Sequence, residues 1–369
     1  MIFAKKYDLC ACLHTTCACL SLSLWAALAL LPFTQSSFAQ SSSSKIADVP
    51  SNHVFEVYVR AKIAFDAKDY GQAATLFAEA ESAHPGQTDS LVFEGKALVN
   101  VGDFAGADRA LETYLTRNPQ SAEALYLLGY VLQRENKPKE SLESFTRAAA
   151  LRPPQANDLK LVGLDYVLLD DYRDAIRWLT RAVEMDAHNS EAWYDLGRAQ
   201  MNQGHFIEAE QAFKRVLELS PRDVKAENNL GLVYEAQNRT DDALKADEAA
   251  IAWESSSKNP SELPLLNYGT LLVTRNRWAD AIAVLEPAIK LAPLNAACHE
   301  QLARAYLQAG NITGASIEMS RAAQIEPGNA RYHYELGRIY RRAGLKNEAQ
   351  QELDRSAALY GTKSTPQDK

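Results

Sequence analysis

The clearest candidate for chemistry in this sequence is the tripeptide Cys298-His299-Glu300. A thiol, an imidazole and a carboxylate are the groups of an activated cysteine nucleophile, provided that the imidazole reaches the sulfur. These residues are adjacent along the chain, and adjacent side chains of a helix point about 100° apart, so they do not form a nucleophile–base pair. No nucleophile elbow, phosphate-binding loop, dinucleotide fingerprint or zinc-protease motif occurs elsewhere. The sequence predicts a protein that is not an enzyme and needs no cofactor.

Histidines and cysteines are the residues from which a metal site would be built. Four of the five cysteines form two Cys-Ala-Cys pairs near the N-terminus, Cys10 with Cys12 and Cys17 with Cys19. No second set of ligands accompanies them, as a zinc site would require. His299 and His333 occupy equivalent places in a repeat described below, which is typical of packing residues. We therefore expect no metal site.

The net charge of the chain is −8 and its isoelectric point is about 5.5. Proteins that bind nucleic acid normally carry a basic surface, so this composition argues against a nucleic-acid partner. Hydrophobic residues make up 47% of the sequence, which is typical of a folded protein.

The N-terminus has the pattern of an export signal. Lys5 and Lys6 precede an apolar run from Leu20 to Leu31, and the small residues Ser37 and Ala39 fit positions −3 and −1 of a signal-peptidase site. A transmembrane helix needs about 20 apolar residues, so this shorter run predicts a signal peptide over 1–39, cleaved to leave no membrane span. An uncleaved anchor is the alternative. A serine-rich flexible linker is expected over 40–53.

One small residue recurs through the rest of the chain at a spacing of 34 residues, with a single step of 38. The recurring positions are Ala73, Ala107, Ser141, Ala175, Ala209, Ala243, Ala281, Ala315 and Ala349. Twelve residues earlier stands glycine or alanine, four residues later usually a large apolar residue, and a proline often closes the unit. Nine repetitions of one register predict a repeat protein.

Helix geometry explains this register. In the unit 190–223, Trp193 and Gly197 share one helix face, Gly204 marks a turn, and Phe213 lies on the apolar face of a second helix. Two such helices can approach closely where their crossing residues are small. A single pair cannot bury both apolar faces, so neighbouring pairs must stack.

The run Ala192 to Gly197, with Ala209, Phe213 and Pro221, resembles the tetratricopeptide repeat, and the overall pattern is similar to exported bacterial members of that family. The resemblance covers residues 54 to about 360. It implies an all-α, right-handed superhelical solenoid of about nine helix-turn-helix repeats. Its first helices would line a concave groove that binds extended peptides or helices of partner proteins.

The sixth repeat departs from the pattern. Its core position holds Asp247, and four extra residues, 258–261, follow it. We expect either a longer loop or a hinge between repeats 1–6 over 54–257 and repeats 7–9 over 262–360. A disordered tail is predicted over 361–369.

Five positions of each first helix are expected to face the groove. The basic residues there are Lys62, Lys96, Arg134, Lys160, Arg198, Lys225, Arg304, Arg331, Arg338, Arg341 and Arg342, and the acidic ones are Asp66, Asp89, Glu123, Glu191, Glu235 and Glu300. A positive groove on an acidic protein would attract an acidic segment of a partner.

Two patches within this groove are the predicted partner-binding sites, because aromatic residues and arginine are enriched at binding hot spots. The middle patch comprises Tyr126, Tyr130, Lys160, Tyr194, Arg198, Lys225 and Asn228. The end patch comprises Arg331, Tyr334, Arg338, Arg341 and Arg342. The Lys–Asn carboxylate clamp of chaperone-binding relatives is absent, since Leu164 stands where the asparagine would follow Lys160.

These features predict an exported, periplasmic or secreted scaffold that binds an acidic protein or peptide segment in its groove. The alternative is a structural subunit of an envelope or secretion assembly that uses its convex or edge surfaces. The sequence does not indicate an oligomeric state.

Overall fold

A computed structural model of the protein describes residues 51–363, and these form eighteen α-helices and no strand. By their internal contacts they divide into two compact units, with the boundary in the sequence between Pro153 and Pro154. The predicted signal peptide and its four cysteines, linker residues 40–50 and tail residues 364–369 lie outside this range. Each helix within 51–363 is too short or too polar to span a bilayer.

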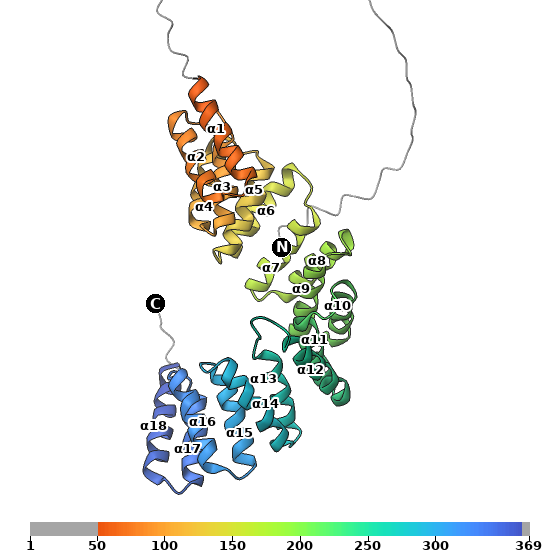
Figure 1. Cartoon of the computed structure of the whole chain (residues 1–369), viewed down its shortest axis with the longest axis vertical. Coiled ribbons are helices and arrows are strands. Elements are labelled where there is room, and N and C mark those ends of the chain that lie inside the picture. The colour runs from red at the N-terminus through yellow and green to blue at the C-terminus, as the bar shows by residue number, and fades with distance from the viewer. Residues whose placement is uncertain (1–50, 364–369) are drawn as a thin grey trace, which may run out of the picture. The chain divides into compact units, whose positions relative to one another are not determined.

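The first unit contains three consecutive helix pairs, coloured from red to yellow in Figure 1. They are α1 (Ser51–Asp66) with α2 (Tyr70–Ala83), α3 (Ser90–Val101) with α4 (Phe104–Arg117), and α5 (Ala122–Arg134) with α6 (Pro138–Leu151). In each pair the two helices pack against one another, and within this unit α2 also contacts α3 and α4 contacts α5.

The second unit continues the same arrangement with six more pairs (Figure 1). They are α7 (Ala156–Leu168) with α8 (Tyr172–Met185), α9 (Ser190–Asn202) with α10 (Phe206–Leu219), α11 (Val224–Ala236) with α12 (Thr240–Glu254), α13 (Leu263–Thr274) with α14 (Trp278–Leu291), α15 (Ala296–Gln308) with α16 (Ile312–Ile325), and α17 (Ala330–Arg342) with α18 (Lys346–Lys363). The described part of the chain is thus an all-α solenoid of nine helix pairs, as the sequence predicts.

The turn inside every pair contains one residue in the left-handed backbone region. These residues are Lys68, Gly102, Asn136, Asp170, Gly204, Asn238, Asn276, Gly310 and Gly344. Glycine adopts this conformation at no steric cost, and asparagine and aspartate tolerate it better than most residues. The tight turn is a property of the repeat, and four of the nine repeats use glycine for it.

In seven of the nine described pairs a glycine of the first helix lies against a side chain of the second helix, which is large and apolar in all but the sixth pair. A Cβ added at Gly197 would lie 2.8 Å from the Phe213 ring, and one added at Gly129 would lie 2.9 Å from the Phe145 ring. Both rings are fully buried. Any larger residue at these glycines would force the two helices apart, which explains the small residue that the repeat requires there.

Within the second unit, first helices also contact the first helices of neighbouring pairs, α7 with α9, α9 with α11, α11 with α13 and α13 with α15. They therefore present a common surface, which we call the first-helix face. Of the basic residues that the sequence assigns to a groove, Lys160, Arg198, Lys225 and Arg304 come from these helices.

The helices cross two of the predicted boundaries. Helix α1 begins at Ser51, inside the predicted linker, and α18 continues to Lys363, beyond the predicted start of the tail at Gly361. The division into units falls at Pro153–Pro154, and the four-residue insertion 258–261 lies inside the second unit. Two successive prolines end α6 because they lack amide protons and disfavour helix before them.

Candidate functional site

The Cys298 thiol is fully buried in α15. Burial, with a smaller effect of Glu262, raises the pKa of this thiol to about 11. The nucleophilic form of cysteine is the thiolate. Cys298 is therefore a packing residue at neutral pH, and residues 51–363 contain no group of three or more potential ligands that could hold a metal.

His299 and His333 each connect the second helix of their own repeat to the proline that closes the preceding repeat. His299 Nδ1 lies 2.7 Å from Glu318 Oε2, and its Nε2 lies 3.1 Å from the carbonyl oxygen of Pro293. His333 makes the same two contacts with Glu352 and Pro327. A carbonyl oxygen only accepts, so Nε2 must carry a proton in both rings. The hydrogen bond to Glu318 is the main reason that the pKa of His299 is raised.

The predicted middle patch is divided between the two units. Tyr126 and Tyr130 belong to the first unit, and the other five residues belong to the second. The Tyr126 ring is only 7% exposed, its hydroxyl donates to the carbonyl oxygen of Arg152, and the Arg152 guanidinium lies 4.7 Å from the ring centre. The Tyr130 hydroxyl accepts from Arg134. Tyr126 is thus covered by its own repeat rather than open to a partner.

Lys160 is also less accessible than the sequence suggests. Its side chain is 11% exposed, and its Nζ donates to Glu191 at 2.6 Å, which holds the pKa of Glu191 below its usual range. Other groove charges pair in the same way, Lys96 with Glu123 and Arg331 with Glu300. These ion pairs link first helices of successive repeats and reduce the charge available for a ligand.

The remaining residues of the middle patch, Tyr194, Arg198, Lys225 and Asn228, come together in one pocket of about 770 Å³ on the first-helix face. We call it the central pocket. Its lining is Tyr194, Arg198, Asp223, Val224, Lys225, Asn228, Asn229, Glu254, Asn259, Ser261, Leu263 and Pro264. Helices α9 and α11 supply one side, and the loop around the insertion supplies the other.

The acidic side chains of the central pocket are already engaged in hydrogen bonds to backbone amides, whereas its basic side chains form no ion pair within the described residues. The Asp223 carboxylate caps α11 by accepting from the Ala226 amide, and Glu254 accepts from the Ser261 amide. Arg198 and Lys225 form no ion pair within the described residues. The basic groups are therefore the ones that can bind a ligand.

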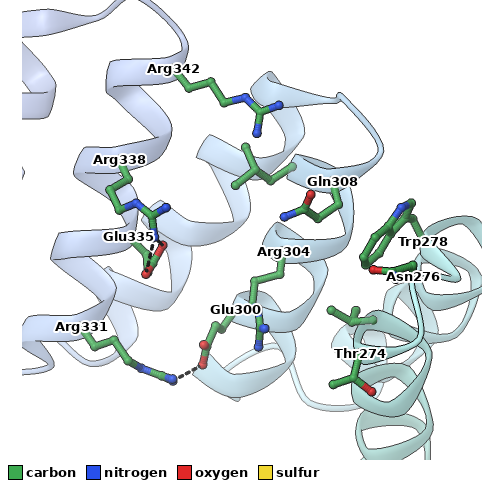
Figure 2. A pocket seen from close by; sticks show the side chains of 12 residues that line it. Thr274, Asn276, Trp278, Glu300, Arg304, Gln308, Arg331, Glu335, Arg338 and Arg342 are labelled. Atoms are coloured by element: carbon green, nitrogen blue, oxygen red, sulfur yellow. Dashed lines mark hydrogen bonds and ion pairs between the residues drawn. The ribbon is translucent and has the colours of Figure 1, made fainter.

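Three residues of the end patch line a second pocket, of about 580 Å³, which we call the arginine pocket (Figure 2). Its lining is Val273, Thr274, Asn276, Trp278, Glu300, Arg304, Leu307, Gln308, Arg331, Glu335, Arg338 and Arg342. The side chains come from α13, the turn after it, the start of α14, and from α15 and α17. Tyr334 and Arg341 are exposed on α17 but do not line this pocket.

Both glutamates of the arginine pocket are engaged, as the dashed lines in Figure 2 mark. Glu300 is 5% exposed and accepts from Arg331, while Glu335 accepts from Arg338 at 3.2 Å. Burial raises the pKa of Glu300, and the Arg331 and Arg304 charges oppose that shift. Glu300 therefore fixes Arg331 at the edge of the pocket.

Sequence reasoning found Arg304 as a groove position but did not include it in the site. The signal was present, because Arg304 follows the small residue of its first helix as Arg198 and Arg338 follow theirs. Trp278, at the start of a second helix, and Asn259, in the insertion, lie outside the groove positions of the repeat. No sequence signal marked them.

Comparison with known proteins agrees with this architecture. Two models described as tetratricopeptide repeat match the chain, one over residues 94–156 and 194–260 and the other over 167–212 and 272–333. Together they cover more than half of the 369 residues.

Two curated relatives illustrate the similarity. Anaphase-promoting complex subunit 3 of Schizosaccharomyces pombe is 22% identical over 246 residues, which are 66% of this chain and 36% of that protein. Cytochrome c-type biogenesis protein CycH of Pseudomonas aeruginosa is 31% identical over 149 residues, which are 40% of this chain and 34% of that protein. The chain spans about a third of the length of these relatives.

Among solved structures, a tetratricopeptide repeat protein from Parabacteroides merdae matches with a TM-score of 0.55 and 18% identity, over 73% of this chain and 98% of that one. This match concerns the fold alone. With nine helix pairs in the predicted register and two repeat models matched along it, the chain belongs to the tetratricopeptide repeat family.

Proposed function

We propose that this protein is an exported scaffold that binds an acidic segment of a partner protein at the central pocket of its first-helix face. Its work is to hold that partner, and no catalytic step is assigned to it. Tetratricopeptide repeats generally act as protein-interaction scaffolds, and the central pocket is the feature of this chain that supports a specific site.

The observation that carries the proposal is the meeting of Tyr194, Arg198 and Lys225 in one open pocket. Its volume of about 770 Å³ lies in the range of ligand-binding clefts. Two uncommitted cations beside an aromatic ring are suited to a carboxylate-bearing segment, because charge-assisted hydrogen bonds are stronger than neutral ones. The guanidinium of Arg198 lies 5.9 Å from the centre of the Tyr194 ring.

The amides of the pocket suit a peptide backbone. Asn228 Oδ1 accepts from Asn267 at 2.9 Å, and Asn229 donates both to the Tyr194 hydroxyl and to the Lys225 carbonyl oxygen. The Asn228 side chain therefore keeps its amino group for a ligand carbonyl oxygen. Since one side-chain amide can both donate and accept, such residues match the alternating groups of a main chain.

An assembly subunit is the second candidate, and one observation favours it. An apolar pocket of about 420 Å³ lies between α12, the insertion loop, α13 and α14, lined in part by Ile251, Pro260, Leu265 and Leu291. It adjoins the central pocket, with which it shares Glu254, Ser261 and Pro264, and it offers an apolar contact surface. The name of the Schizosaccharomyces pombe relative, a subunit of a complex, is compatible with this role.

The test is capture of a partner in the native host, with a photo-crosslinking residue placed at Arg198. A parallel sample carries the crosslinker at Arg173 of α8, an exposed arginine on a second helix. We expect a defined crosslinked protein from position 198 and none from position 173. The partner segment, mapped by mass spectrometry, should be rich in aspartate or glutamate.

A triple variant then tests the side chains themselves. Tyr194→Ala, Arg198→Glu and Lys225→Glu together should abolish recovery of that partner, while Arg173→Glu with Arg181→Glu should leave it unchanged. If the triple variant recovers the same partner as the wild type, the central pocket is not the binding site. Crosslinks at Leu265 or Leu291 instead would favour the assembly subunit.

Export is tested separately by sequencing the N-terminus of the protein recovered from the cell envelope and culture fluid. A chain that starts at Gln40 supports the predicted cleavage after Ala39. A chain that retains its first 39 residues in the membrane fraction would replace the cleaved signal with an anchor.

A further inference from the structure

The arginine pocket holds more positive charge than its own carboxylates balance. Four of its lining residues are arginines and two are glutamates. Glu300 and Glu335 are each engaged by one arginine, as described above. Arg304 donates only to the neutral amide oxygen of Gln301 at 3.3 Å, and Arg342 forms no ion pair within residues 51–363.

These two arginines come from different helices and face a shared space. Figure 2 shows Arg304 extending from α15 and Arg342 from the end of α17, with Gln308 between them along the pocket. Each guanidinium can bind a carboxylate through two parallel hydrogen bonds. The pocket therefore offers two separate anion positions and not a single concentrated one.

Apolar side chains form part of the pocket wall opposite α17. Trp278 and Leu307 are both half-buried, and they line the pocket beside the buried Val273. Asn276 and Trp278 lie together at the turn that begins α14 (Figure 2). A ligand that spans the pocket would thus meet an aromatic ring between or beside the two cations.

We propose that the arginine pocket is a second binding site, which takes an acidic protein segment whose two carboxylates bind Arg304 and Arg342 and whose intervening apolar side chain packs on Trp278. This proposal rests on the proposed function in one respect, namely that the first-helix face binds protein segments. It uses a pocket and residues that the central pocket does not share.

Charge and shape favour a peptide over a phosphate-bearing ligand. A phosphate concentrates its charge, whereas Glu300 of α15 and Glu335 of α17 place two negative groups in the pocket lining. The volume of about 580 Å³ exceeds what one phosphate fills and accommodates several side chains. A nucleic acid is disfavoured by the net charge of −8 on the chain.

The experiment is a fluorescence-anisotropy titration of the purified protein with labelled peptides. The probe is Ala-Glu-Glu-Leu-Glu-Glu-Ala, and the comparison peptides replace every Glu by Gln or the Leu by Gly. We expect the acidic peptide to bind at low salt, the Gln peptide to bind at least about tenfold more weakly, and salt to weaken the binding of the acidic peptide. The Gly peptide should also bind more weakly than the acidic peptide, but by a smaller factor than the Gln peptide.

Variants assign the binding to the pocket. Arg304→Gln with Arg342→Gln should weaken the acidic peptide about tenfold or more, and Trp278→Ala should remove the difference between the Leu and Gly peptides. Glu335→Gln should strengthen binding, because it frees Arg338 and removes a repelling charge. The matched control, Arg321→Gln with Arg355→Gln, removes two exposed arginines from the second helices α16 and α18 and should change nothing.

Two results would overturn the proposal: unchanged affinity in the Arg304→Gln/Arg342→Gln protein, or displacement of the peptide by inorganic phosphate as effective as by unlabelled peptide. Far-UV circular dichroism of each variant verifies that its helices are retained. The triple variant of the central pocket should still bind the probe. Its loss of the native partner together with retained probe binding would separate the two sites.

Discussion

The fifth and sixth repeats place opposite kinds of side chain at the same point of the same helix pair. In the fifth, the fully buried Phe213 ring packs beneath Gly197. In the sixth, Asp247 occupies the equivalent place beneath Gly231 and is only 2% exposed. Both pairs nevertheless form, with helices of similar length and a left-handed residue in the turn. The repeat architecture therefore does not depend on a large apolar residue in every pair.

The fifth and sixth repeats have the same architecture, but they must differ in stability. Asp247 Oδ1 has no hydrogen-bond partner within the described residues. Burial, with smaller effects of Glu235, Glu227 and Glu248, raises the pKa of Asp247 to about 7. The sixth repeat thus keeps its fold at an energetic cost, and it is the repeat from which α11 and the adjoining insertion build the central pocket. Binding sites are often drawn from the less stable parts of a structure.

The largest expected effect comes from making the fifth repeat resemble the sixth. Phe213→Asp removes a buried ring, which typically costs about 3–5 kcal/mol for a change to alanine, and adds a buried carboxyl. We expect a loss of about 5 kcal/mol in the free energy of unfolding, measured by urea denaturation. Ile207→Asp, at a 67% exposed position of the same helix, should stay within about 0.5 kcal/mol of wild type.

The reverse change should stabilise the sixth repeat. Asp247→Leu replaces an unpaired buried carboxyl with the residue that fills this place in the fourth and seventh repeats, Leu179 and Leu285. We expect a gain of about 2–3 kcal/mol near pH 8, because apolar replacements of buried charged groups often stabilise by about 1–4 kcal/mol. Lys245→Leu, on the exposed side of α12, is the control. A variant less stable than wild type would mean that Asp247 has a compensating partner.

The pH dependence of the free energy of unfolding should distinguish the sixth repeat, with its buried Asp247, from the fifth. The pKa of Asp247 is about 7 in the folded protein and about 4 when unfolded, so the folded state holds its proton more tightly. Stability therefore falls as pH rises through this window, by about 2–3 kcal/mol between about pH 5 and pH 8. Other carboxyls titrate there too, Asp195 with a pKa of about 6 and Glu94 with one of about 7. The measurement is therefore the difference in the free energy of unfolding between wild type and Asp247→Leu as a function of pH. This difference should shrink towards acid pH. A difference that is constant with pH would refute the raised pKa of Asp247.

The sequence predicted the fold well because a 34-residue register fixes which residues cross and which face the core. The same register correctly grouped Tyr194, Arg198 and Lys225, since equivalent positions of successive first helices lie side by side. It identified the Asp247 anomaly for the same reason.

The site was less predictable because a position in the repeat does not say what covers it. Tyr126 and Tyr194 are equivalent residues, and both pack on a phenylalanine, Phe145 or Phe213. Tyr126 is buried under Arg152, whereas Tyr194 remains half-buried at an open pocket. Such covering contacts depend on loop residues that the repeat does not constrain, as do the contributions of the insertion to the central pocket.

The smallest expected effect concerns the two glycines. At Gly197 an added Cβ would approach three atoms of the Phe213 ring within 3.0 Å, so Gly197→Ala should cost about 1–2 kcal/mol even after the better helix propensity of alanine. At Gly231 the close contact is a single carboxylate oxygen of Asp247, at 2.3 Å. Aspartate is smaller than phenylalanine and can turn its carboxyl aside, so Gly231→Ala should cost less, by about 0.5 kcal/mol or more.

A double-mutant cycle completes this comparison. In the Asp247→Leu protein the space beneath Gly231 is filled, so Gly231→Ala should there become as costly as Gly197→Ala. The difference between the two backgrounds measures the coupling of residues 231 and 247, which pairs in contact show at about 0.5–3 kcal/mol. Additive effects would mean that the carboxyl already fills its site as rigidly as a ring does, and the sixth repeat would then differ from the fifth in polarity alone.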